Sequence, residues 1–157
     1  MRILVAAVGR FGAGPGKAGA ERTLFDEYAR RMNAPVSLRE VEEKRPLTPD
    51  ALMKSEAEKL RSAIPKGAVT VALDAGGKEF SSEDLARHFQ KWRDEGVKDV
   101  AFVIGGAEGL DRSVKEQATM RLSLGPMIWP HMLVRVMLME QIYRAQCILS
   151  GHPYHRA

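Results

Sequence analysis

Cysteine is nearly absent from this chain, with one, Cys147, among 157 residues. A single cysteine excludes an intramolecular disulfide and fits a reducing compartment. Cys147 lies inside an apolar run with helical spacing, which favours a buried, inert thiol over a catalytic nucleophile. We therefore expect no cysteine chemistry in the function.

Long hydrophobic runs are also missing. No stretch approaches the roughly 20 apolar residues of a membrane span. The opening run Met1–Val8 is too short for a signal peptide and leads into a turn at Gly9. Internal repeats, low-complexity tracts and linkers are lacking as well. We expect a cytoplasmic protein without membrane contact, folded as one domain over residues 1–157.

Neither sign of charge dominates the chain. The sequence has 24 Lys and Arg against 20 Asp and Glu, a net charge of +4 that is spread along its length. Without a basic stripe, nucleic-acid binding is permitted by the charge but not demanded by it. The hydrophobic fraction of 45% and the charged fraction of 28% are ordinary for a globular protein and exclude a disordered chain.

Apolar, β-branched runs alternate with segments of helical periodicity. This alternation predicts an α/β fold with a mostly parallel sheet that helices cover on both faces. Ser81 and Asp84 have the spacing of a helix N-cap. The expected strands are Ile3–Val8, Val36–Val41, Ala68–Leu73, Val100–Ile104 and Arg121–Leu124, and the expected helices are Ala20–Met32, Pro49–Ile64, Ser81–Asp94 and Pro130–Leu149.

The last expected helix, Pro130–Leu149, is apolar around most of its circumference. Such a helix must be buried on all sides. In so small a domain one side can meet the sheet, and we expect the other to meet a second copy of the chain in a homodimer. Among its few charges, Glu140 and Arg144 stand four residues apart in the favourable order for an ion pair.

Two kinds of glycine-rich segment suggest different functions. Gly14–Gly19 spells G-x-G-x-x-G before a helix, the pattern of a dinucleotide site in an oxidoreductase. The preceding strand already turns at Gly9, which favours a flexible surface loop over that site. Three other segments follow strands directly and together indicate a nucleotide-like pocket. These segments are Leu73–Lys78, Gly105–Gly109 and Gly125–Pro130.

Two imidazoles, a phenol and a guanidinium are concentrated at the end of the chain, in His152–Arg156. Pro153 fixes the local backbone there. Three of the four histidines, His131 among them, fall in the final 27 residues. This combination of acid–base groups indicates that the terminal residues belong to an active site.

Several of these segments together resemble the ribosomal large-subunit methyltransferase H family of the SPOUT superfamily. They are Ile104–Gly109, Pro130–His131, Leu133–Arg135, Glu140–Ala145 and His152–Arg156, with Met1–Gly9 and Leu73–Lys78 also matching. The resemblance spans essentially the whole chain. It implies a homodimeric, S-adenosylmethionine-dependent enzyme with a C-terminal trefoil knot. The implied reaction methylates N3 of a pseudouridine in helix 69 of 23S ribosomal RNA, on the assembled ribosome.

The resemblance also implies roles for particular residues. The family commonly has Pro where this chain has Ala107, and Leu-Thr-Leu where it has Met127-Ile128-Trp129, so backbone contacts survive but a threonine hydroxyl is lost. No metal is expected. The implied cofactor-binding residues are Leu73, Gly106, Gly125, Pro126, Met127, Ile128, Trp129 and Pro130, and the implied substrate and catalytic residues are His131, Arg144, Tyr154, His155 and Arg156.

Methylation of an imide nitrogen requires removal of its proton. His131 and His155 have side chains with a suitable ordinary pKa for this step, and the choice between them stays open. Arg156 is expected to stabilise negative charge on the base or hold a phosphate, and Tyr154 to stack on the base. The alternatives are a dinucleotide-dependent oxidoreductase and a non-catalytic ribosome-binding protein.

Overall fold

The computed structural model describes residues 1–12 and 19–156. Within them the chain forms five strands and five helices in the order expected of an α/β protein. The strands are β1 (Arg2–Val8), β2 (Val36–Val41), β3 (Val69–Glu79), β4 (Asp99–Ile104) and β5 (Met120–Ser123). The helices are α1 (Gly19–Arg31), α2 (Pro49–Ala63), α3 (Ser82–Asp94), α4 (Arg112–Gln117) and α5 (His131–Ser150).

Contacts divide the chain into two compact units. The sheet unit comprises Met1–Arg10, Pro35–Glu79 and Lys98–Met127, and the helical unit comprises Phe11–Ala34, Phe80–Val97 and Ile128–Ala157. Each unit is assembled from three separate stretches of sequence, so neither could form from one continuous segment. Of the glycine-rich loop Gly14–Gly19, residues 14–18 lie outside the described residues, and Gly19 begins α1.

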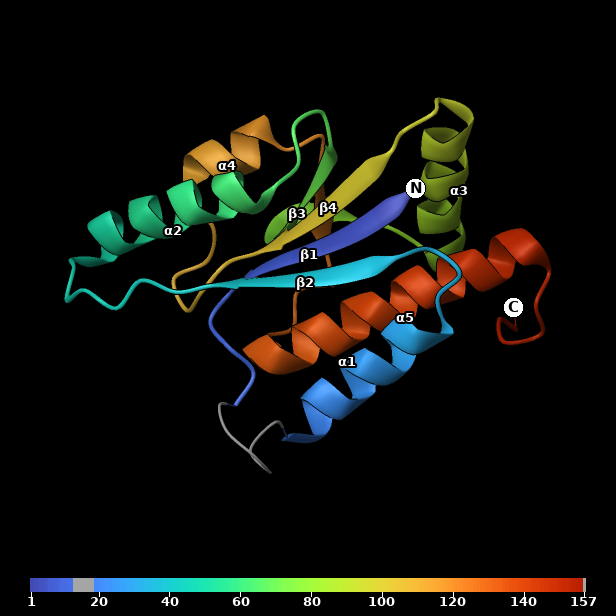
Figure 1. Cartoon of the computed structure of the whole chain (residues 1–157), viewed down its shortest axis with the longest axis horizontal. Coiled ribbons are helices and arrows are strands. Elements are labelled where there is room, and N and C mark those ends of the chain that lie inside the picture. The colour runs from blue at the N-terminus through green and yellow to red at the C-terminus, as the bar shows by residue number, and fades with distance from the viewer. Residues whose placement is uncertain (13–18, 157) are drawn as a thin grey trace. The chain divides into compact units, whose positions relative to one another are not determined.

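The sheet unit is built on a five-stranded parallel sheet with the order β2-β1-β4-β3-β5 (Figure 1). The register pairs Val5 with Leu38 on one side and with Phe102 on the other. From Ile3 to Val8 every residue of β1 is buried, and β4 is buried from Val100 to Ile104. Such near-continuous apolar runs are typical of central parallel strands, and this is why both strands could be predicted from the sequence.

Strand β3 differs from its expected course. The sequence predicts that it ends at Leu73 and that Leu73–Lys78 forms a loop, whereas the strand continues to Glu79 around a wide bulge. Both Leu73 and Lys78 pair with Leu122 of β5, so the four residues between them are accommodated by the bulge. A Cβ at Gly77 would lie 2.8 Å from the Arg121 carbonyl carbon. The glycine thus lets the bulged chain lie against β5 instead of leaving the sheet.

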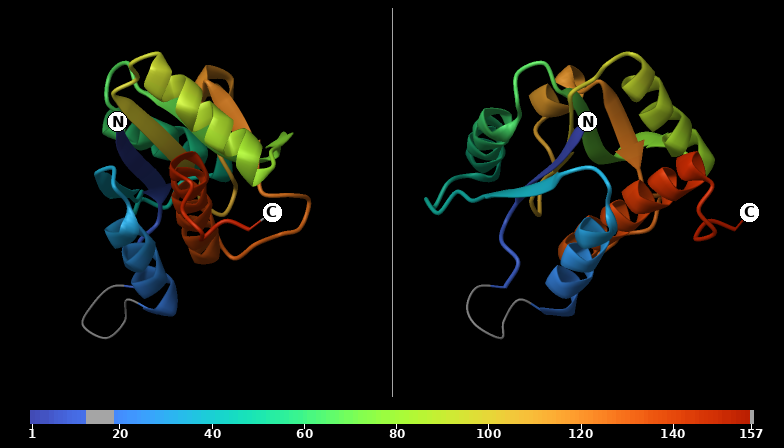
Figure 2. Two further views of the ribbon diagram at one scale, coloured as in Figure 1. Left: turned by 90° about the vertical axis from the view of Figure 1, so that its right-hand side faces the viewer. Right: turned by 45° about the vertical axis from the view of Figure 1, so that its right-hand side comes forward.

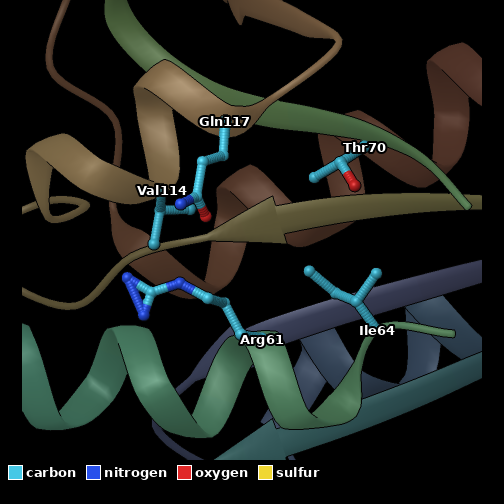
Figure 3. Close-up of a pocket in the computed structure, with 5 residues that line it drawn as sticks. All are labelled: Arg61, Ile64, Thr70, Val114 and Gln117. Atoms are coloured by element: carbon cyan, nitrogen blue, oxygen red, sulfur yellow. The ribbon is translucent and has the colours of Figure 1, made fainter. Parts of the chain in front are cut away.

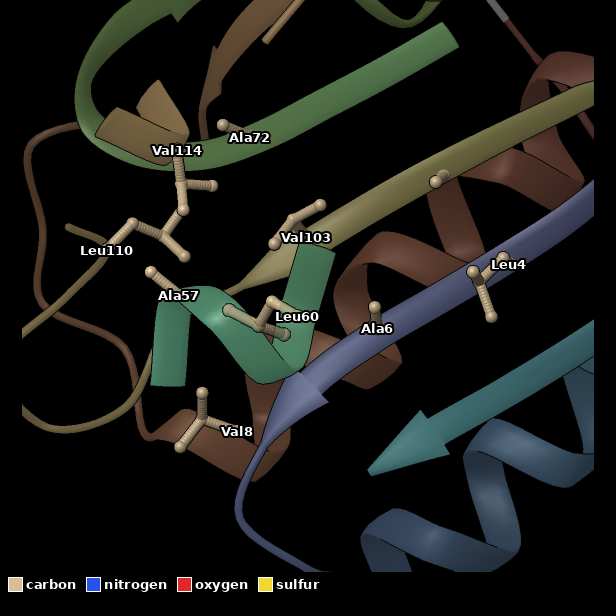
Figure 4. Packing of buried hydrophobic residues seen from close by; sticks show 10 residues of the cluster. Leu4, Ala6, Val8, Ala57, Leu60, Ala72, Val103, Leu110 and Val114 are labelled. Atoms are coloured by element: carbon tan, nitrogen blue, oxygen red, sulfur yellow. The ribbon is translucent and has the colours of Figure 1, made fainter. Parts of the chain in front are cut away.

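One face of the sheet carries helices α2 and α4 (Figure 1). Ala57 and Leu60 of α2 share one apolar cluster with alternate residues of β1 and β4 and with Leu110 and Val114 (Figure 4). Helix α2 begins after Thr48, whose side chain accepts a hydrogen bond from the Ala51 N–H, and Pro49 occupies its first turn. Helix α4 was not predicted, because six residues are too few to show a helical period.

In the helical unit, α5 packs against both α1 and α3 (Figure 2). Tyr28 of α1 lies against Tyr143 of α5 at 6.0 Å between ring centroids. The predicted cap of α3 is confirmed, with Ser81 and Asp84 each bonding the other's backbone N–H. Helix α5 begins one residue later than expected, with Pro130 at its N-cap. Cys147 is buried, as predicted.

Candidate functional site at the strand ends and the C-terminus

Three predicted cofactor-binding segments of the sheet unit belong to three neighbouring strands, two of them following a strand and the third, Leu73–Lys78, forming the bulge inside β3. Gly106 comes after β4, Leu73 lies in β3 and Gly125 comes after β5, and these strands are adjacent in the sheet. Because the strands are parallel, their carboxyl ends lie along one edge. Ligands of open α/β sheets bind outside this edge. The strand order, which the sequence could not supply, thus brings the three segments together.

The turn after β4 folds back sharply on itself. The Gly109 N–H donates to the Gly106 carbonyl at 3.0 Å, and a Cβ at Gly105 would lie 2.5 Å from the Gly109 carbonyl carbon. At Gly106 a Cβ would lie 2.8 Å from the Oε2 atom of Glu56. The sequence predicts that this glycine admits a ligand. The structure shows that a carboxylate of α2 already occupies the position of its absent side chain.

The loop after β5 is exposed and apolar. Gly125 has a φ of +96°, which favours glycine there. Its N–H donates to the Ser123 hydroxyl at 3.1 Å, and that hydroxyl lies 3.2 Å from the Ala75 carbonyl in the β3 bulge. Ser123 was missed by sequence reasoning, although a hydroxyl ending a buried strand was the available signal. Pro126 and Pro130 are exposed, as are Met127, Ile128 and Trp129, with Ile128 98% exposed.

His131 lies at the first turn of α5, beside Arg135. The Nη2 atom of Arg135 is 3.3 Å from the His131 Nε2 atom, and its guanidinium lies 4.7 Å from the Phe11 ring centroid. A guanidinium only donates hydrogen bonds, so Nε2 must be the acceptor and the imidazole proton sits on Nδ1. While this contact is kept, the Nε2 lone pair of His131 is not available to another group.

Three of the predicted site residues, Arg144, Tyr154 and His155, meet beside the second half of α5. Sequence reasoning missed their neighbours Tyr28 and Glu83. We call this group the C-terminal cluster: Tyr28, Glu83, Glu140, Arg144, Tyr154 and His155. Glu140 is its centre, since it accepts hydrogen bonds from Tyr154 at 2.8 Å and from Arg144 Nε at 3.0 Å. The Arg144 guanidinium also lies over the Tyr154 ring, 4.9 Å from its centroid. The predicted Glu140–Arg144 pair is therefore confirmed, and it organises the tail as well.

Burial holds the pKa of the Tyr154 phenol above its usual range, and hydrogen bonds to Tyr28 and Glu140 add to the shift. The phenol therefore stays protonated at neutral pH and donates to Glu140. The Arg144 pKa is raised by its hydrogen bond to Glu140. The protonated Tyr154 phenol and the protonated Arg144 guanidinium can both donate the hydrogen bonds that hold the cluster together.

His155 lies between two charged groups of the helical unit. Its Nδ1 atom is 3.4 Å from Arg144 Nη1, and its Nε2 atom is 3.0 Å from the Glu83 carboxylate of α3. Arg144 can only donate, so Nδ1 accepts and Nε2–H donates to Glu83. The next residue, Arg156, is exposed. The tail is thus anchored as far as His155, and its last guanidinium faces solvent.

His131 and the C-terminal cluster are far apart within one chain. His131 and Arg144 are thirteen positions apart in α5. At 1.5 Å per residue this spacing is about 20 Å along the helix axis. Glu140, which holds the Tyr154 hydroxyl, is nine positions from His131, or about 14 Å along the axis, so this separation argues against one copy placing both groups around a single base.

A cavity of about 200 Å³ lies elsewhere in the sheet unit, between α2 and α4 (Figure 3). Arg61 and Ile64 line one side, and Val114 and Gln117 line the other. Thr70, at the start of β3, completes it, so the cavity belongs to the amino end of that strand. None of the predicted site residues lines it.

Within residues 1–12 and 19–156, no three His, Cys, Asp or Glu side chains gather in a way that could hold a metal ion. In the same part of the chain, no helix combines the length and apolarity needed to cross a membrane.

A five-stranded parallel sheet of order β2-β1-β4-β3-β5 defines a protein of the open α/β class. More narrowly, residues 1–155 match the family model described as predicted SPOUT methyltransferase, and the chain belongs to that family. The resemblance drawn from the sequence motifs is thereby confirmed.

Curated relatives match over the full length. The chain is 53% identical over 156 residues to the ribosomal RNA large subunit methyltransferase H of Paramagnetospirillum magneticum, covering 99% of each chain. It is 53% identical to the protein of that name from Rhodospirillum centenum, covering 100% of each. Among solved structures, a probable methylase family protein from Haemophilus influenzae is similar in fold, with a TM-score of 0.54 and 12% identity, covering 99% of this chain and 70% of that one.

Proposed function

We propose that this chain transfers a methyl group from S-adenosylmethionine to N3 of a pseudouridine in helix 69 of 23S ribosomal RNA, on the assembled ribosome. The observation that carries the proposal is the full-length identity of 53% to relatives named ribosomal RNA large subunit methyltransferase H. The modest net charge of +4 favours a composite ribosomal surface over one free RNA hairpin as the substrate.

The strand-end segments fit a nucleoside cofactor. Leu73, Gly106 and the loop from Gly125 to Pro130 offer backbone groups and apolar side chains at neighbouring strand ends. When bound, S-adenosylmethionine supplies an electrophilic methyl carbon on a sulfonium. The chain's part is to hold that carbon in line with the base nitrogen, since positioning two reactants supplies much of such a rate.

Residues of α5 and the tail handle the base and its proton. The imidazoles of His131 and His155 are the candidate proton acceptors, and each must first release the arginine that contacts it. Tyr154 presents a protonated phenol and a ring face, which suit contact with an extruded base. Arg144 and the exposed Arg156 suit the negative charge that develops on the base carbonyls or a nearby phosphate.

A homodimer completes the site in this proposal. His131 and Arg144 stand thirteen residues apart on one helix, so a second copy would have to bring its C-terminal cluster to the first copy's His131. Leu133 and Met137 of α5 are partly exposed apolar residues one turn apart, and they suit such an interface. We propose that both units of each copy act as one methyltransferase domain, since a single family model spans them. The trefoil knot and the cytoplasmic location remain predictions.

A mass-spectrometric map of helix 69 tests the function directly. Ribosomes from cells lacking the protein should contain unmethylated pseudouridine, and the purified chain with labelled S-adenosylmethionine should restore the methyl group. Label appearing in assembled ribosomes but not in free 23S RNA would support the composite substrate. Ribosome binding without methyl incorporation would instead favour a non-catalytic ribosome-binding protein, and affinity for a nicotinamide dinucleotide would favour an oxidoreductase.

A further inference from the structure

Glu56 is a buried acidic residue that the proposed reaction leaves unexplained. It lies in the middle of α2 and is only 7% exposed. Its neighbour Ala57 and the next turn's Leu60 belong to the apolar core under that helix (Figure 4). Charged side chains are rarely so buried unless a partner compensates for the lost hydration.

Glu56 has no such partner among the residues that the structure describes. No hydrogen bond or ion pair joins its carboxylate to another described residue, and burial raises its pKa above the ordinary value. Glu43, only 5% exposed at its side chain, shows the contrast, because Arg45 and Ser55 both donate to it. An uncompensated buried carboxyl is costly, and such groups cluster at functional sites.

The carboxylate points to the edge of the sheet where ligands bind. Its Oε2 and Oε1 atoms lie 2.8 Å and 3.5 Å from the place of a Cβ at Gly106. The same place is 3.1 Å from Cγ1 of Val8, the last residue of β1. Glu56 is therefore held between the carboxyl ends of β1 and β4, directly against the glycine turn, where a hydrogen-bond acceptor would be close to any bound nucleoside.

We propose that Glu56 is a cofactor-binding residue whose carboxylate accepts a hydrogen bond from a donor group of S-adenosylmethionine at the Gly106 turn. This inference rests on the proposed function. The cofactor has two kinds of suitable donor, the ribose hydroxyls and the ammonium of its methionine part. Either would provide the partner that the carboxylate lacks among the described residues.

Binding measurements on the full chain test the assignment. Isothermal titration would compare wild type, Glu56→Gln and the matched control Glu58→Gln, which neutralises an exposed carboxylate on the same helix. The probes are S-adenosylhomocysteine and methylthioadenosine, which keeps the ribose but lacks the amino-acid part. We expect Glu56→Gln to weaken S-adenosylhomocysteine binding about tenfold or more, and Glu58→Gln to change it less than about twofold.

The two probes separate the donors. Weaker binding of both assigns the ribose hydroxyls, and weaker binding of S-adenosylhomocysteine alone assigns the ammonium. Either result supports the proposal. Unchanged affinity of Glu56→Gln for both probes overturns it while leaving the proposed function intact. A Glu56→Gln protein that unfolds at a lower temperature and binds neither probe overturns it too, by making Glu56 structural. If wild type binds neither probe, the proposed function itself fails and this inference falls with it.

Discussion

Tyr154 makes more side-chain contacts than is usual for a residue three positions from a chain end. Its hydroxyl donates to Glu140, its ring lies 4.8 Å from that of Tyr143, and the Tyr28 hydroxyl is 3.4 Å from its own. In the structure the tail is already docked on α1, α3 and α5, so Tyr154 is positioned in advance.

Replacing Tyr154 by Phe removes its hydroxyl while keeping its ring contacts. We expect the methylation rate to fall about tenfold or more, because the phenol that would meet the base is gone. Cofactor affinity should stay the same. The measurement is single-turnover methylation of ribosomes.

Tyr28→Phe is the matched control for Tyr154→Phe, since it deletes another hydroxyl of the same cluster from α1. It should leave the rate within about twofold and lower the free energy of unfolding by about 1 kcal/mol at most. Equal loss of activity in both variants would show that the hydroxyls serve only to hold the tail.

The buried carboxyl of Glu56 predicts an unusual pH dependence of stability. Burial raises its pKa in the folded state, so the folded protein favours the neutral form. Its contribution to stability is therefore full below the ordinary pKa of Glu and is lost as the pH rises through the raised value. Glu56→Gln stays neutral throughout, so we expect it to unfold at a higher temperature than wild type at pH 8.

Thermal unfolding between pH 4 and pH 8 measures this effect. The gap between Glu56→Gln and wild type should close as the pH falls, whereas Glu58→Gln should follow wild type at every pH because its carboxylate is exposed. A gap that is constant with pH would mean that the charge of Glu56 costs the fold nothing.

At the scale of elements, helix ends decide where the functional groups lie. Helix α5 stops at Gly151, whose φ of +69° is left-handed, and the His152 N–H returns to the Cys147 carbonyl at 2.9 Å. This glycine-ended turn reverses the chain. The reversal lets Tyr154 and His155 reach back to Glu140 and Arg144, one to three turns before the end of the same helix.

The capping box of α3 gives an element-scale prediction. Ser81→Ala removes a side chain that accepts from the Asp84 N–H and should lower the free energy of unfolding by about 1 kcal/mol. Urea denaturation followed by circular dichroism measures it. Ser62→Ala in α2 is the control, because that hydroxyl bonds only a carbonyl within its helix, and it should change stability by less than about 0.5 kcal/mol.

At the scale of the whole molecule, the separation of His131 from the C-terminal cluster predicts complementation between copies. His131→Ala and Tyr154→Phe homodimers should each be impaired. In the proposed homodimer, mixed dimers carry one site with both original residues if the two groups of a site come from different copies. Co-expression should therefore restore activity to about a quarter of wild type, as expected for half of the dimers being mixed with one intact site each.

The measurement is the methylation activity of the co-purified mixture per amount of protein. The control for subunit exchange is a mixture of the two variants that are combined only after folding. Activity no higher than the average of the two single variants would contradict a site shared between copies. Such a result would mean that His131 and the C-terminal cluster do not act in one shared site.

Much of the fold could be predicted from the local pattern of apolar and capping residues. The central strands β1 and β4 and the helices α1, α2, α3 and α5 were predicted within one or two residues, because apolar runs and capping residues act over a few neighbours. The bulge in β3 was not, because it depends on the close approach of Gly77 to Arg121 of another strand. The six-residue helix α4 was not predicted, because it is too short to show the helical repeat of apolar residues.

The sequence by itself determined the α/β class, the glycine turns after β4 and β5, the Glu140–Arg144 pair and the family, since all of these follow from local spacing or motif order. Only the tertiary structure decided that β4, β3 and β5 are neighbours, that His155 lies between Arg144 and Glu83, and that Glu56 fills the space beside Gly106. The physical reason is distance along the chain. Glu56 and Gly106 are fifty residues apart, and no local propensity carries the information that packing brings them into contact.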